Sequence, residues 1–174
     1  MTQGANMYKK ILSVGLCFIA CNSLYAKEFS IVLHSIEAIK VQEQKGDELY
    51  LHLTEYPQDA KPTLARFPDF PGYWLSKNLA NVKDVVIYTS SINKDKITEI
   101  IVSLIEQDLP PWAPDDHLGS IKLKLKNNND LLEVNWESKQ YNDPAFTKQS
   151  TNLDCSFMFS DGKAKYLARF KLLD

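Results

Sequence analysis

Hydrophobic and polar residues alternate along most of the chain from about residue 29 onward, as they do in β-strands with one buried face. The segment 48–54 has leucine at every second position, and the segment 119–126 alternates apolar residues with lysines. Shorter strand-like segments are residues 29–33, 85–88, 97–105, 132–136, 157–159 and 166–172. Because short turn sequences rather than long linkers separate these segments, they predict a single all-β domain, an antiparallel sandwich of eight strands.

The segment 97–105 fits two periods at once. The isoleucines at 97, 100, 101 and 105 have the spacing of a helix, whereas Ile100, Val102 and Leu104 have the spacing of a strand. Many of its residues are β-branched, and no helix cap follows Asp108. These two features favour a strand that is buried on both faces.

Two interruptions of the alternation are informative. The apolar phase shifts between Leu33 and Ile36, which predicts a β-bulge within a long first strand. Four prolines fall between residues 57 and 73, and each removes a donor from the hydrogen-bond ladder. We therefore expect irregular or edge structure in that region.

The first residues have the pattern of an export signal. Lys9 and Lys10 precede an apolar stretch, residues 11–20, which has the length of a secretory signal core and is too short to span a membrane. Cleavage after Ala26 would make residues 1–26 a signal peptide and residues 27–174 a periplasmic or secreted domain. The alternative is a lipoprotein acylated on Cys21, and an intact mass of the mature protein would distinguish the two.

The composition after Ala26 is that of a folded, acidic domain. About 148 residues remain, enough for one domain with a substantial core. They carry 18 basic and 22 acidic residues, a net charge of −4, which disfavours general nucleic-acid binding. Cys155 is the only cysteine of this part, so no internal disulfide can form, and its apolar neighbours predict that the thiol is buried. We expect a monomer.

One acidic connection stands out, between residues 106 and 119. It holds four carboxylates in a proline-rich segment flanked by two apolar strands: Glu106, Asp108, Asp115 and Asp116. Carboxylates gathered in a loop can bind a cation that relieves their mutual repulsion.

This connection resembles the third loop of the C2 domain family, in which an Asp-x-Asp pair is followed, after a spacer, by Asp-x-Ile-Gly. Glu106 and Asp108 match the pair, and residues 116–119 match the second element. The acidic start of the strand at residues 47–50 resembles the first loop of the family. The resemblance covers residues 29 to 126 and implies a C2-like β-sandwich.

The resemblance implies a calcium site formed by two loops. Ca²⁺ takes six to eight oxygen ligands, several of them carboxylates. The first candidates are Asp47, Asp108 and Asp116, and the second are Glu43, Glu106 and Asp115. The alternative is that these carboxylates are solvated loop residues without an ion.

Two further features are candidates for contact with a membrane or a partner. Trp112 lies within the acidic connection, where an aromatic side chain can insert at a membrane interface, pack on a partner or cover the core. Lys122, Lys124 and Lys126 share one strand face, which in the C2 family meets acidic phospholipids. The alternative for these lysines is the guarding of a sheet edge against aberrant pairing.

No catalytic motif stands out in the sequence. It contains no Gly-x-Ser-x-Gly, no His-Glu-x-x-His and no phosphate-binding glycine loop. We therefore expect an exported binding module rather than an enzyme, docking through its acidic loops on a phospholipid surface or a protein partner. A metal-independent protein-interaction factor is the alternative, and an envelope hydrolase a more distant one.

Overall fold

The computed structural model describes residues 26–108, 114–129, 131–140 and 143–174, and within them the predicted antiparallel β-sandwich is confirmed. Eleven strands are present in these residues, or ten apart from the two-residue β4, so the predicted count of eight is wrong. The strands are β1 (Ala26–Lys40), β2 (Glu48–Pro57), β3 (Thr63–Phe67), β4 (Trp74–Leu75), β5 (Lys83–Asn93), β6 (Ile97–Glu106), β7 (Asp116–Asn128), β8 (Leu131–Gln140), β9 (Asp143–Ser150), β10 (Asp154–Ser160) and β11 (Lys165–Leu173). A short 3₁₀ helix, η2 (Ser76–Asn81), follows β4.

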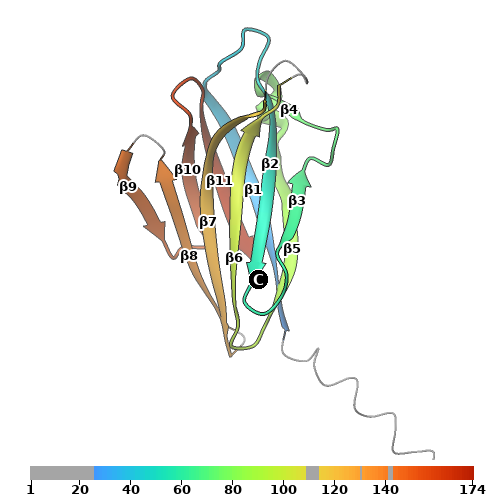
Figure 1. Cartoon of the computed structure of the whole chain (residues 1–174), viewed down its shortest axis with the longest axis vertical. Coiled ribbons are helices and arrows are strands. Elements are labelled where there is room, and N and C mark those ends of the chain that lie inside the picture. The colour runs from blue at the N-terminus through green and yellow to red at the C-terminus, as the bar shows by residue number, and fades with distance from the viewer. Residues whose placement is uncertain (1–25, 109–113, 130, 141–142) are drawn as a thin grey trace, which may run out of the picture.

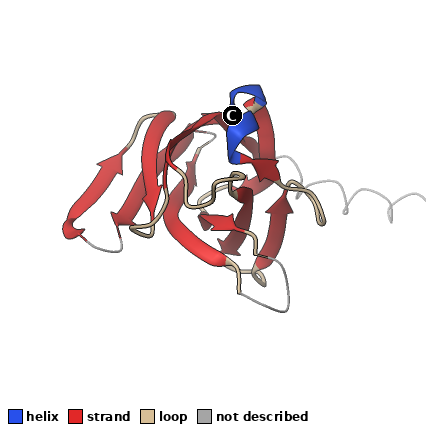
Figure 2. Ribbon diagram, turned by 90° about the horizontal axis from the view of Figure 1, so that it is seen from above, coloured by secondary structure: helices blue, strands red, loops and turns tan. Residues whose placement is uncertain are grey.

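The strands form two sheets. Sheet A has the order β10-β11-β1-β5, and sheet B has the order β3-β2-β6-β7-β8-β9, with β4 paired to β2. All pairings are antiparallel. Figure 1 shows the two layers along the strands, and Figure 2 shows them from above.

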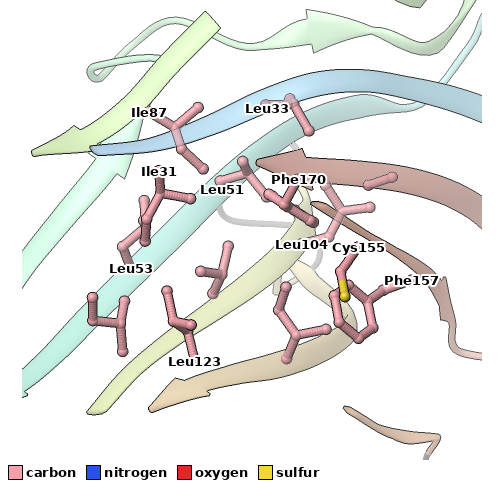
Figure 3. Packing of buried hydrophobic residues seen from close by; sticks show 14 of the residues in the cluster. Ile31, Leu33, Leu51, Leu53, Ile87, Leu104, Leu123, Cys155, Phe157 and Phe170 are labelled. Atoms are coloured by element: carbon pink, nitrogen blue, oxygen red, sulfur yellow. The ribbon is translucent and has the colours of Figure 1, made fainter. Parts of the chain in front are cut away.

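The core lies between the sheets and consists of the alternating positions that the sequence pattern predicts. Leu49, Leu51 and Leu53 are at most 1% exposed. Trp136 is fully buried and packs against Phe157 and Phe170. Figure 3 shows side chains of both sheets meeting in this layer. Burial of this apolar surface is the main source of stability in a domain without a disulfide.

The structure confirms three local predictions. Residues 97–106 form the predicted strand, β6, but the predicted burial of both faces is wrong: the inward face, with Val102 and Leu104, is buried, and Ile101 and Ile105 on the outward face are half-buried. Register shifts interrupt the pairing of β1 near Leu33, as expected for a bulge. Cys155 is a free, buried thiol. Residues 1–25 lie outside the described part of the chain, so the export signal stays a prediction.

The proline-rich region is an edge of sheet B. β3 is a short strand at one end of the strand order of sheet B. In that order its only neighbour is β2. Residues 68–73 then run without regular structure to β4. The expectation of irregular or edge structure between residues 57 and 73 is therefore confirmed.

Candidate cation-binding site

The two acidic loops lie at the same end of the sandwich. Leu49 pairs with Glu106, and Glu106 pairs with Asp116, so the start of β2, the end of β6 and the start of β7 are neighbours. The backbone N–H of Gln107 also donates to the carbonyl of Glu48, at 2.7 Å. Figure 1 shows the β1–β2 connection, the end of β6 and the start of β7 at one end of the molecule.

The β1–β2 loop, residues 41–47, has a defined conformation. Gly46 has a φ of +96°, and its N–H donates to the carbonyl of Glu43 at 3.1 Å. A Cβ at this position would approach the Ser76 hydroxyl to 3.0 Å, so the turn requires glycine for both its conformation and its space. Ser76 in η2 exchanges two 2.9 Å hydrogen bonds with Asp47 and so holds the loop against the sandwich.

Three carboxylates gather between these loops. One oxygen each of Glu43, Glu106 and Asp108 lies within 4.8 Å of the other two. Glu43 is exposed, Asp108 is half-buried, and Glu106 is only 1% exposed. We call these three residues the acidic trio. They come from both loops, as the sequence analysis expects of a two-loop cation site.

Glu106 is the unusual member of the trio. Its Oε2 is buried and accepts no hydrogen bond from the described residues. Burial first, and then the negative charges of Asp108, Glu43 and Asp47, raise the pKa of Glu106 to about 7, while a backbone hydrogen bond from Glu48 opposes the shift. A buried carboxylate beside two others carries a large cost when ionised, unless a proton or a cation neutralises it.

Asp47, a first candidate for the metal, is placed differently. Its side chain is fully buried and accepts hydrogen bonds from the backbone N–H groups of Gln42 and Glu43 and from the hydroxyl of Tyr166. Burial, and then the bond to Asp47, raise the pKa of the Tyr166 phenol. The carboxylate oxygens of Asp47 are occupied by these donors, so Asp47 orders the loop beside the trio and is not a member of it.

Asp115 and Asp116 also lie outside the trio. Asp116 is contacted by the Lys163 ammonium and the Gln42 side-chain amide, each at 3.3 Å. Asp115 accepts a 2.8 Å hydrogen bond from the Tyr50 hydroxyl; burial and this bond raise the pKa of Tyr50 to about 12. Of the six predicted ligands, the structure therefore brings together Glu43, Glu106 and Asp108.

The three lysines of β7 have acidic partners on neighbouring strands. Lys122 contacts Glu137 at 2.9 Å, and Lys124 and Lys126 lie 3.8 Å from Glu99 and 3.9 Å from Glu133. Strand β7 is central in sheet B, between β6 and β8, so the interpretation of these lysines as guards of a sheet edge is wrong. Their charges are balanced across strands, which leaves little free positive potential for acidic phospholipids.

Trp112, the predicted membrane or partner contact, lies outside the described residues. Arg66 is a residue that no sequence pattern singled out. It stacks on Tyr50 and contacts the loop residue Gln107, so it borders the same end of the sandwich.

Comparison with known proteins gives no relationship from which a function could be transferred. No family model matches the chain, and no curated protein is significantly similar to it. Within the described residues, no helix has the length and apolar character needed to cross a membrane.

Proposed function

We propose that this chain is an exported binding module that takes up a divalent cation, with calcium as the expected ion, in the acidic trio. The bound ion then allows the loop end to dock on a phospholipid surface or a protein partner. The observation that carries the proposal is the buried, unpartnered Oε2 of Glu106 in a group of three converging carboxylates. A native protein rarely leaves such an atom without a partner unless a ligand completes it.

The donor set suits a hard cation. Carboxylate oxygens from Glu43, Glu106 and Asp108 match the ligands that Ca²⁺ prefers, and no nitrogen or sulfur ligand belongs to the trio. Three carboxylates supply fewer than the six to eight oxygens that calcium takes unless they bind in bidentate fashion. The remaining positions are open to water or to an oxygen of the docked partner.

Calcium should stabilise the protein measurably. With a dissociation constant of about 0.1 mM, 10 mM calcium adds roughly 2.7 kcal/mol to the free energy of unfolding. The melting temperature should then rise by about 5 to 10 °C over the metal-free protein. Differential scanning calorimetry with and without chelator measures this shift, and isothermal titration calorimetry measures the affinity.

Two variants separate the trio from the other acidic residues. Glu106→Gln should remove the calcium shift, because it takes away the buried charge of the trio. Asp116→Asn is the matched control and should keep the shift, because Asp116 lies outside the trio and contacts Lys163. An unchanged melting temperature of the wild type in calcium would exclude the site.

Docking on a membrane should depend on the ion. We expect the protein to sediment with phosphatidylserine vesicles in calcium and to remain in the supernatant with chelator. Glu106→Gln should stay soluble in both conditions, which controls for vesicle aggregation by calcium itself. Sedimentation that does not respond to chelator would contradict the calcium-dependent mode.

The metal-independent alternative also has a supporting observation. Phe70 is 79% exposed and Leu64 is 71% exposed, and both belong to the β3 region of sheet B. Exposed apolar side chains of this size are common features of protein-interaction surfaces. Absence of calcium binding and of vesicle sedimentation would favour this alternative.

A further inference from the structure

Arg66 in β3 has unusual surroundings for a surface arginine. Its guanidinium carbon lies 4.0 Å from the centre of the Tyr50 ring and 5.4 Å from the centre of the Phe70 ring. Nη2 donates a 2.7 Å hydrogen bond to the amide oxygen of Gln107. Two aromatic rings and a neutral amide therefore hold the guanidinium in place.

The positive charge of Arg66 has no carboxylate partner among the residues that the structure describes. Within the described part of the chain it forms no ion pair, and its Nη1 is buried without an acceptor. The nearby Asp115 accepts hydrogen bonds from the Tyr50 hydroxyl and the Asp108 N–H. A buried N–H donor without an acceptor costs about 1 to 3 kcal/mol, which a ligand oxygen would offset.

Arg66 also begins a row of hydrogen-bonding side chains on the outward face of sheet B. His52 is the cross-strand partner of Arg66, Ser103 is the partner of His52, and Ser120 is the partner of Ser103. Cross-strand partners project from the same face with Cβ atoms about 5 Å apart. We call these four residues the polar row. It contains a guanidinium, an imidazole and two hydroxyls, and no carboxylate.

The serine end of the row borders a hollow. The hydroxyls of Ser103 and Ser120 lie 2.7 Å apart, and Nε2 of His117 lies 2.8 Å from the Ser120 hydroxyl. A surface cavity of about 290 Å³ adjoins Ser120 and is also lined by Ile101, Ile121 and the Lys122–Glu137 ion pair. A ligand held at Arg66 could therefore extend along hydrogen-bonding groups toward this cavity.

We propose that the polar row is a binding site for an oxyanion, a carboxylate or phosphate group, with Arg66 as its anchor. The planar guanidinium can donate two parallel hydrogen bonds to such a group, and His52 on the adjacent strand supplies a further donor. This site lies on the sheet face, is distinct from the acidic trio, and does not depend on the cation. Binding requires access to Nη1, and Phe70 is the flanking ring that can move at the lower cost. Its side chain is 79% exposed, whereas Tyr50 belongs to the interior strand β2.

The two arginines of the chain provide an internal control. Arg66 and Arg169 are the only arginines in the sequence, and Arg169 is exposed on β11 of sheet A. An NMR spectrum of the arginine Nε–Hε groups should therefore contain one signal from each arginine. The signal that disappears in Arg66→Lys belongs to Arg66. Inorganic phosphate and acetate are titrated separately into the metal-free protein in low-salt Tris buffer.

We expect the Arg66 signal to shift saturably with at least one of the two anions while the Arg169 signal stays in place. The anion with the lower dissociation constant identifies the ligand as a phosphate or a carboxylate. Arg66→Lys should weaken anion binding at least tenfold. The shifts of the backbone amide signals of His52 and Ser103 report the binding in this variant. Arg169→Lys should change it less than twofold. Equal, non-saturating shifts of both arginine signals, or no shift with either anion, would overturn the proposal. This titration uses the wild-type protein, so it does not depend on whether a variant folds.

Discussion

Replacing Glu106 by glutamine is expected to raise the free energy of unfolding of the metal-free protein at pH 8 by about 3 kcal/mol. Glutamine has nearly the same shape but no charge, and its amide can donate to the carboxylates of Glu43 and Asp108. The variant therefore removes the cost of a buried negative charge beside two others. An increase of this size from one substitution on a buried residue is uncommon, since most substitutions destabilise.

The pH dependence identifies the cause. The pKa of Glu106 is raised from 4.5 in the unfolded chain to about 7 in the folded protein. Below pH 4.5 both states are protonated and Glu106 costs nothing. Between pH 4.5 and 7 the unfolded state releases the proton first, so the wild type loses stability, and above pH 7 the loss is complete.

Urea unfolding at pH 5 and pH 8 measures this difference. Glu106→Gln should exceed the wild type by about 3 kcal/mol at pH 8 and by much less at pH 5. Glu99→Gln is the matched control, because Glu99 belongs to the same strand but faces outward beside Lys124, where its charge costs little. A gain for Glu106→Gln of equal size at both pH values would mean that packing, rather than charge, explains it.

Calcium should remove most of the difference between the two proteins. The ion neutralises the trio of the wild type and restores the stability lost to the buried charge, whereas the glutamine variant gains little. The same residue thus lowers stability without the ion and is required for the stabilisation with it. Strain held at a binding site and relieved by the ligand is a common arrangement in proteins.

The sequence was sufficient to predict the sandwich because its signal is local. Alternation in residues 48–54 and 119–126 identified the buried faces of β2 and β7 directly. The strand count was too low because the weak signals were missed. Residues 63–67 include a pair of exposed positions, and β4 has only two residues, so neither shows a clear alternation.

The candidate site was predictable in its location but not in its internal arrangement. Two acidic loops at one end follow from the strand order, which the sequence does not predict; the resemblance to the C2 family predicts only that the two loops meet. Which carboxylates converge depends on hydrogen bonds between distant segments, such as the contact of Asp47 with Tyr166, 119 residues away. The role of Arg66 depends in the same way on three separate segments: β2, residues 68–73 and the end of β6.

Asp47→Ala should destabilise the protein by about 3 to 5 kcal/mol, in calcium and in chelator alike. The substitution leaves the N–H groups of Gln42 and Glu43 and the hydroxyl of Tyr166 without their acceptor in a site that water does not reach. Each unsatisfied donor costs about 1 to 3 kcal/mol. Relief of repulsion on Glu106 offsets part of the loss, since Asp47 is one of the charges that raise the pKa of Glu106.

Asp161→Ala is the control for this prediction. Asp161 also accepts hydrogen bonds from two backbone N–H groups, those of Lys163 and Ala164, but it lies in the solvent-accessible turn between β10 and β11. Water can replace its carboxylate there, so the expected loss is about 1 kcal/mol or less. Urea unfolding of both variants compares the two sites. If Asp47→Ala instead keeps the stability of the wild type in chelator and loses only the gain from calcium, then Asp47 is a ligand of the ion rather than the residue that orders its loop.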